Sequence, residues 1–148
     1  MKRNRFEYPL ILEDIADELA YTRSQLSKEY YKGEKNRGDR EHEISRLGII
    51  AELVGRYRMK ELKLDAVFAP LIELKPVNRP DMRFKGKDYD IKGLKPDCNM
   101  LRINAKSFEN SNKFCHYYWF ISPENGNANT YAYSRDEILR NWKYTKYR

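Results

Sequence analysis

Residues that commonly build zinc centres and disulfide scaffolds are scarce in this sequence. Its 148 residues include 2 cysteines and 2 histidines. No structural zinc-site spacing occurs among the four, which are Cys98, Cys115, His42 and His116. The two cysteines form neither a CxxC pair nor a disulfide framework. We therefore expect neither a zinc-dependent fold nor catalysis by paired histidines.

Long apolar runs are also absent. No stretch approaches the roughly 20 apolar residues of a membrane-spanning helix, and the mean hydropathy is −0.90. The first residues, MKRNRFEYPLILEDIADELA, begin with basic side chains, but Glu7, Pro9 and Glu13 interrupt them before an apolar signal-peptide core can form. We expect a cytoplasmic protein with no membrane partner.

Positive charge is in excess. Lys and Arg number 29 against 22 Asp and Glu, which gives a formal net charge of +7. Apolar residues, at 41%, are too many for a disordered chain, and the length suits one domain with its own core. A basic excess of this size favours a polyanion partner such as nucleic acid, although many basic proteins bind nothing specific.

Two amphipathic helices are predicted near the start of the chain. Pro9 suits a first helical residue, and apolar residues recur near helical spacing from Ile11 through Leu19, which predicts a helix to about residue 31. Two glycines and mixed charges at 32–39 indicate an exposed connector. A second helix is predicted over about 40–62, because its apolar residues form one stripe.

The second helix contains two glycines. Gly48 and Gly55 are seven residues apart, so they share a face of the helix. Each costs roughly 0.5 to 1 kcal/mol relative to alanine in a helix interior. We infer that another part of the chain approaches the helix backbone closely at these positions.

The pattern becomes extended from residue 64 onward. Apolar and aromatic segments bounded by Pro, Gly and Asn predict strands at 65–69 or 71–74, 81–84, 88–92, 100–107, 116–122 and 130–133. Asn125-Gly126 predicts a tight turn. Ser134 and Glu137 form a capping box for a last helix through Trp142. Helices, then a sheet, then a helix predict a single α/β domain.

The stretch RPDMRFKGKDYDIKG carries the chemistry. If its turn lies at Lys85-Gly86, antiparallel pairing places Asp81 opposite Asp90. The other pairs are Met82 with Tyr89, Arg83 with Asp88 and Phe84 with Lys87. Side chains alternate faces along a strand, so the two carboxylates share a face with Lys92. Opposed residues have Cβ atoms about 4.5 to 5.5 Å apart, and two carboxylates at that distance repel each other.

A divalent cation would remove this repulsion. Mg²⁺ prefers hard oxygen ligands and keeps several waters when one or two carboxylates and a substrate phosphate bind it. Such an ion lowers the pKa of a bound water and neutralises charge on phosphorus oxygens. Lys92 could hold the attacking water or stabilise the transition state. The sequence therefore predicts a Mg²⁺ or Mn²⁺ site at Asp81 and Asp90 that serves phosphate chemistry.

At these residues the sequence resembles the PD-(D/E)xK nuclease superfamily. The motif reads Pro80-Asp81, eight residues, then Asp90-Ile91-Lys92, with a hairpin between its halves. The resemblance implies a restriction-endonuclease-like α/β fold, with a central mixed β-sheet flanked by helices. Residues 39–143 would form the core, 1–38 an N-terminal helix and connector, and 144–148 a basic tail. It also implies a metal-dependent nuclease, above all a DNA endonuclease, that hydrolyses phosphodiester bonds with a metal-activated water.

The resemblance further implies a glutamate on the helix before the hairpin. Glu52, one turn after Gly48, is the natural candidate for a further metal ligand, directly or through water. Glu43 is the weaker substitute. The alternative role for Glu52 is a surface ion pair with Arg56 at i,i+4. The predicted catalytic residues are thus Asp81, Asp90, Lys92 and Glu52, of which Asp81, Asp90 and Glu52 would bind the metal.

A second register competes with this assignment. Asn104-Ala105-Lys106 resembles an acid-x-lysine motif with asparagine in the acid position. Asp90 would then be the first carboxylate, and Lys106 would be the catalytic lysine. We prefer the earlier register because it keeps both carboxylates and a short hairpin. Asn104 and Lys106 would then line the nucleic acid or be solvated.

Residues around the motif and in the tail are candidates for contact with nucleic acid. They are Arg83, Asn104, Lys106, Lys143, Lys146 and Arg148. No recognisable helix-turn-helix or zinc finger supplies base readout, so the sequence leaves base specificity open. Cutting both strands of a duplex would need a homodimer or two encounters.

Two other functions stay open. One is a basic nucleic-acid-binding protein whose fold keeps the carboxylates without catalysis, which predicts salt-sensitive binding that persists in chelator. The other is a small α/β protein that binds a protein partner and carries its charge for solubility. The choice between DNA and RNA also stays open.

Overall fold

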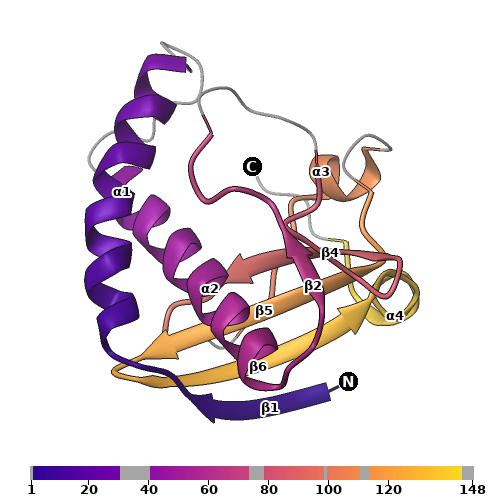
Figure 1. The fold of residues 1–148 in the computed structure, drawn as a ribbon. Helices are drawn as coiled ribbons and strands as arrows, with labels where there is room; N and C mark the ends of the chain where they lie inside the picture. Colours follow the sequence, from indigo (N-terminus) through magenta and orange to yellow (C-terminus); the bar gives the residue numbers. More distant parts are fainter. Residues whose placement is uncertain (1, 31–40, 74–78, 99, 111–113, 145–148) are drawn as a thin grey trace.

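The computed structural model describes residues 2–30, 41–73, 79–98, 100–110 and 114–144. Within them the chain forms a mixed α/β arrangement of helices and one six-stranded sheet (Figure 1). The elements are β1 (Lys2–Glu7), α1 (Ile11–Tyr30), α2 (Glu41–Glu61), β2 (Ala66–Phe68), β3 (Met82–Phe84), β4 (Lys87–Gly93), α3 (Ala105–Glu109), β5 (Tyr117–Glu124), β6 (Asn127–Ser134) and α4 (Arg135–Asn141). None of the described helices has the length and apolar character needed to cross a membrane.

The sheet is mixed, as predicted. Its strands lie in the order β1-β6-β5-β4-β3-β2. β4 and β5 run parallel, with α3 between them in the chain. The other neighbouring strands are antiparallel. β4 therefore lies inside the sheet, between its hairpin partner β3 and the parallel strand β5.

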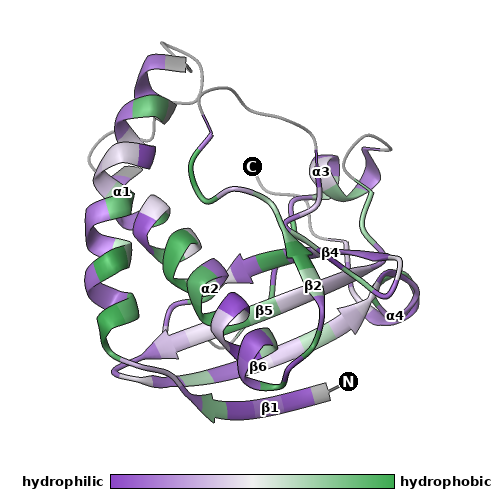
Figure 2. Cartoon of the chain, viewed as in Figure 1, coloured by the Kyte–Doolittle hydropathy of each residue, from purple (hydrophilic) through white to green (hydrophobic). Residues whose placement is uncertain are grey.

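Apolar side chains cover both faces of the sheet. Ile49, Val54 and Ile91 belong to a buried cluster that α1 and α2 form with one face. Tyr118 and Phe120 of β5 belong to a second buried cluster, with α3 and α4. Figure 2 shows apolar residues concentrated on parts of α1 and α2, whereas other parts of both helices are hydrophilic. The expected amphipathic helices are thus confirmed.

Both predicted hairpin turns are confirmed. Lys85 and Gly86 have φ values of 51° and 73°, and Asn125 and Gly126 have values of 48° and 84°. A type I′ turn requires positive φ at both central residues, which asparagine and glycine adopt at low cost. The first turn gives the predicted register, with Met82 opposite Tyr89, Arg83 opposite Asp88 and Phe84 opposite Lys87.

Details of the second and last helices also agree with the sequence. The N–H of Glu137 donates to Oγ of Ser134 at 3.1 Å, and the N–H of Ser134 donates to Oε1 of Glu137 at 3.2 Å, which is the predicted capping box.

In α2, a Cβ built at Gly55 would lie 3.2 Å from the Trp119 ring and 3.3 Å from the Ile121 side chain. Gly55 therefore allows the close approach of helix and sheet that its presence predicts.

One strand prediction is wrong, and the sequence does not predict β1. Residues 100–107 form no strand. Instead, Oδ1 of Asn104 accepts hydrogen bonds from the N–H groups of Lys106 and Ser107, so Asn104 caps the start of α3. β1 is polar except for Phe6, so it shows no alternation, yet it pairs along its length with β6. Of the two alternatives for the first strand, 65–69 is correct, since β2 lies within it.

Candidate metal centre

Asp81 lies directly before β3, where two backbone groups fix it. The N–H of Ala69 donates to its carbonyl oxygen at 3.0 Å. The N–H of Ile91 donates to its Oδ2 at 2.8 Å. These bonds hold the carboxyl group against β4. The hairpin register continues to this pair, because Asp81 precedes β3 by one residue and Asp90 lies at the matching position of β4.

Asp81 and Asp90 contact each other through their carboxyl groups. A hydrogen bond joins the two side chains. Burial, then this hydrogen bond and the charge of Asp90, raise the pKa of Asp81 from its ordinary 3.8 to about 9. Two carboxylates this close repel each other, so Asp81 should hold a proton at neutral pH when no cation is bound. A bound cation would take the place of that proton.

Lys92 lies beside the carboxyl pair. Its Nζ is 3.1 Å from Oδ2 of Asp90. Residues two apart on a strand share a face, and Ile91 between them points to the opposite face, into the core under α2. The side chains of Lys92 and Asp90 are 29% and 31% exposed. Both groups can therefore reach a ligand that binds at this face.

Glu52 approaches the same region from α2. Burial raises its pKa, the charge of Arg23 and a hydrogen bond from it lower the pKa, and the charge of Asp90 raises it further. Oε2 of Glu52 lies 2.8 Å from Nη2 of Arg23. Arg56, the partner considered from spacing, instead donates to the carbonyl oxygen of Ala69. Glu52 is thus electrostatically coupled to the carboxyl pair, and its ion-pair partner comes from α1.

The donors at this site fit a hard cation such as Mg²⁺. Among the described residues, no group of three or more His, Cys, Asp or Glu side chains is arranged to hold a metal ion. Mg²⁺ does not need such a group, because one or two carboxylates with waters and a substrate phosphate are its usual ligands. Asp81 and Asp90 would supply those carboxylates if an ion bound here. Glu52, which Arg23 holds, suits a ligand that acts through a water.

Asp88, near the turn of the hairpin, contacts Arg83 and His116. Nε of Arg83 lies 2.8 Å from Oδ1 of Asp88, and the Arg83 side chain is 61% exposed. The N–H of Asp88 donates to Nδ1 of His116 at 3.0 Å, and the N–H of His116 donates to the carbonyl oxygen of Asp88 at 2.9 Å. His116, directly before β5, is thus a hydrogen-bonded residue, while the Arg83 side chain is mostly exposed to solvent.

The other residues predicted to contact nucleic acid are distant from the carboxyl pair in the sequence. Asn104 caps α3, and Lys106 is exposed on that helix. Lys143 is exposed after α4. Lys146 and Arg148 lie outside the described residues. The second register loses its basis, because Lys106 is helical and does not lie on a strand next to the hairpin.

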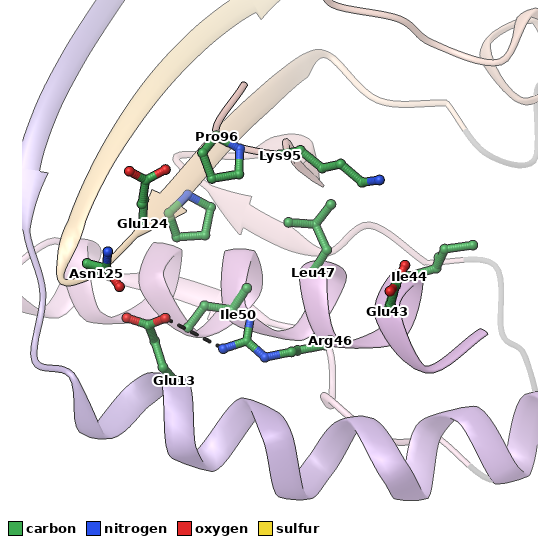
Figure 3. Close-up of a pocket in the computed structure, with 11 residues that line it drawn as sticks. Glu13, Glu43, Ile44, Arg46, Leu47, Ile50, Lys95, Pro96, Glu124 and Asn125 are labelled. Carbon is green, nitrogen blue, oxygen red and sulfur yellow. Dashed lines mark ion pairs between the residues drawn. The ribbon is translucent and has the colours of Figure 1, made fainter. Parts of the chain in front are cut away.

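A separate hollow of about 430 Å³ lies between α1, α2 and the turn that joins β5 to β6 (Figure 3). Apolar side chains such as Leu47 and Ile50 line it together with charged ones. Arg46 in its wall lies 3.5 Å from Glu13 of α1. None of the four predicted catalytic residues lines this hollow, whereas Glu43 does. The structure therefore favours Glu52 over Glu43 as the glutamate of the site.

No local sequence pattern points to Arg23. It lies 29 residues before Glu52 and 48 residues before Leu71, whose carbonyl oxygen accepts from it. Its position follows from the packing of α1 against α2, and spacing within one element cannot encode that contact.

Known proteins provide no relative from which a role for these residues could be transferred. No family model, no curated protein and no solved structure matches the chain. The likeness of residues 80–92 to the nuclease motif remains a resemblance, and the case for the site rests on its geometry.

Proposed function

We propose that the protein is a metal-dependent nuclease, specifically a DNA endonuclease, that hydrolyses phosphodiester bonds without a covalent enzyme intermediate. The observation that carries the proposal is the Asp81–Asp90 carboxyl pair with Lys92 3.1 Å from Asp90. A helix before the hairpin and a parallel strand after it are the context in which the nuclease motif is expected. This order of elements supports a restriction-endonuclease-like fold.

Each residue of the site has a distinct role in the proposal. Asp81 and Asp90 would hold Mg²⁺ or Mn²⁺, and Glu52 would add an oxygen, directly or through water. When bound, the ion would lower the pKa of a water and offset charge that develops on the phosphorus oxygens. Lys92 would donate to the attacking water or to the developing oxyanion. The N–H of Ile91 keeps Asp81 oriented, so the carboxylate needs little reorganisation.

The charge distribution supports a polyanionic substrate. The net charge of +7 includes exposed cations at Arg83, Lys106 and Lys143. Side chains of this kind bind phosphates in any sequence and position the backbone. A phosphate that enters the site brings negative charge toward two carboxyl groups, and a divalent cation between them makes that approach favourable.

Cleavage of DNA in Mg²⁺ or Mn²⁺ tests the proposal. We expect the wild-type protein to cut DNA and chelator to stop it. Asp90→Ala and Lys92→Ala should each slow cleavage by at least about 100-fold. Asp97→Ala, which removes an exposed aspartate outside the site, should cut at the wild-type rate. Full activity in both site variants would contradict the residue assignment.

The second candidate is a nucleic-acid-binding protein without catalysis. The absence of a three-ligand group among the described residues favours it, as does the ion pair that already occupies Asp90 and Lys92. It predicts salt-sensitive binding in chelator and no strand scission at any metal concentration. Metal-dependent scission by the wild-type protein that Asp90→Ala abolishes would exclude it.

A further inference from the structure

Arg23 links three parts of the chain next to Glu52. It lies on α1, and its Nη2 is 2.8 Å from Oε2 of Glu52 on α2. Its Nε donates to the carbonyl oxygen of Leu71 at 3.0 Å, and its Nη2 donates to the same oxygen. Leu71 belongs to the segment that runs from β2 toward Asp81. One guanidinium group therefore connects the N-terminal helix, the glutamate and the chain that leads into the hairpin.

The pair of Arg23 and Glu52 is largely shielded from water. Their side chains are 28% and 18% exposed, so salt screens their attraction less than that of a surface pair. The planar guanidinium fixes the direction of each bond it makes, which a lysine ammonium does not. Among the described residues, no donor contacts Oε1 of Glu52. Arg23 thus occupies one carboxylate oxygen and leaves the other available.

Gly48 lies beside this guanidinium group. It lies one turn before Glu52 on the same face of α2. A Cβ built at Gly48 would lie 3.4 Å from Nη1 of Arg23. An added side-chain carbon would therefore be in ordinary van der Waals contact with Arg23, so the guanidinium is a close neighbour of Gly48 but does not require a glycine there. Arg23 thus lies against the face of α2 that carries Gly48 and Glu52.

We propose that Arg23 is a positioning residue that holds Glu52 for the metal site. The inference rests on the proposed function, because it requires a cation at Asp81 and Asp90. By fixing Oε2, Arg23 restricts the rotation of the Glu52 side chain and keeps Oε1 free for the cation or its water. Hydrogen-bond partners of metal ligands commonly contribute 10- to 100-fold to metal affinity. A residue of the N-terminal helix, outside the hairpin motif, would then complete the site.

Calorimetric titration with Mn²⁺ alone tests this inference. We expect Arg23→Ala and Arg23→Gln to weaken Mn²⁺ binding by about 10-fold or more. The matched control is Arg46→Ala, because Arg46 also joins α2 to α1, through Glu13 and Asp17. It should bind Mn²⁺ like the wild type. Thermal melting establishes that each variant is folded, and Arg23→Gln decides the question if Arg23→Ala does not fold.

A double-mutant cycle separates positioning from general structural support. If Arg23 acts through Glu52, Arg23→Gln should have little further effect on Mn²⁺ affinity in a Glu52→Gln background. An equal loss in both backgrounds would overturn the inference. Unchanged or tighter Mn²⁺ binding by Arg23→Gln in the wild-type background would also overturn it, while cleavage by the wild type would leave the proposed function intact. A wild-type protein that neither binds Mn²⁺ nor cuts DNA would overturn both.

Discussion

At the scale of single residues, Asp81 bears the largest electrostatic conflict of the site. Its carboxyl group is partly buried, accepts a hydrogen bond from Ile91 and faces Asp90. The hydrogen bond from Ile91 favours the ionised form of Asp81, but burial and Asp90 outweigh it, so the pKa rises. The arrangement is unfavourable in a metal-free protein at neutral pH, and the proposed cation would make it favourable.

The metal-free protein should therefore lose stability as the pH rises. Because the pKa of Asp81 is raised in the folded state, its stabilising contribution is fully present below about pH 4 and is lost as the pH approaches about 9. Asp81→Asn still accepts from Ile91 and can donate to Asp90, and it does not titrate. At pH 8 in chelator, we expect the free energy of unfolding of this variant to be higher than that of the wild type by at least about 1.4 kcal/mol, the equivalent of one pKa unit.

Denaturant unfolding across that pH range measures the effect. The wild type and Asp97→Asn, which alters an exposed aspartate, should both show a decline in the free energy of unfolding with pH. Asp81→Asn should show a flatter profile. Parallel profiles for Asp81→Asn and the wild type would mean that the carboxyl pair does not carry the strain assigned to it.

Lys92 should affect the rate of cleavage more than the binding of metal. Lys92→Met keeps most of the aliphatic side chain and removes the charge. We expect single-turnover cleavage at saturating Mn²⁺ to fall by about 10²- to 10³-fold, the usual cost of losing one stabilising donor. The affinity for Mn²⁺ should stay equal or increase, because the positive charge of Lys92 no longer repels the ion. A rate loss explained entirely by weaker metal binding would refute this role.

At the scale of elements, the contact between α2 and β4 sets the distance between Glu52 and Asp90. Gly93 at the end of β4 lies against α2, where an added Cβ would be 2.6 Å from the carbonyl oxygen of Leu47. This carbonyl oxygen belongs to the backbone of α2, so it cannot move away unless the helix shifts. The absence of a side chain at Gly93 is thus a requirement for this packing.

Gly93→Ala should consequently destabilise the protein by about 3 kcal/mol, the upper range for overpacking a core. Gly48→Ala is the matched control, since its Cβ would meet only the flexible end of Arg23 at 3.4 Å. Its higher helix propensity should make it neutral or stabilising by up to about 1 kcal/mol. Chemical denaturation of both variants measures the difference, and equal effects would contradict the packing argument.

The elements that the sequence predicts are those that local signals determine. Lys85-Gly86 and Asn125-Gly126 define their turns by themselves, and Ser134 with Glu137 defines the start of α4. β1 and α3 could not be predicted in this way. β1 is polar and forms through its pairing with β6. In α3, the Asn104 side chain accepts from the N–H groups that follow it, where the sequence pattern predicts a strand.

At the scale of the whole molecule, the net charge of +7 should produce salt-dependent binding of DNA. Each phosphate contact contributes about −0.9 to the slope of log K against log salt. Lys106→Ala should reduce that slope by about 0.9 when binding is measured by fluorescence anisotropy in chelator. Arg5→Ala, on the strand at the opposite edge of the sheet from β2, should leave it unchanged. Equal slopes for both variants would remove Lys106 from the contact surface.

The site itself divides between local and long-range contributions. Asp81, Asp90 and Lys92 come from one hairpin. The predicted turn and the alternation of side chains along a strand are therefore enough to predict that they lie close together. Glu52 comes from α2 and depends on Arg23 of α1, and no spacing in the sequence joins these helices. The carboxyl pair was therefore predictable, whereas the contact between Arg23 and Glu52 required the tertiary structure.

The central claim is that Asp81 and Asp90 together bind a divalent cation, and a crystal grown with Mn²⁺ tests it most directly. We expect an anomalous scattering peak within bonding distance of both carboxyl groups, with Glu52 bound directly or through a water. The peak should be absent from a crystal of Asp90→Ala. No peak at this pair, or Mn²⁺ bound only by the carboxylates of the hollow that contains Glu13 and Glu43, would contradict the account.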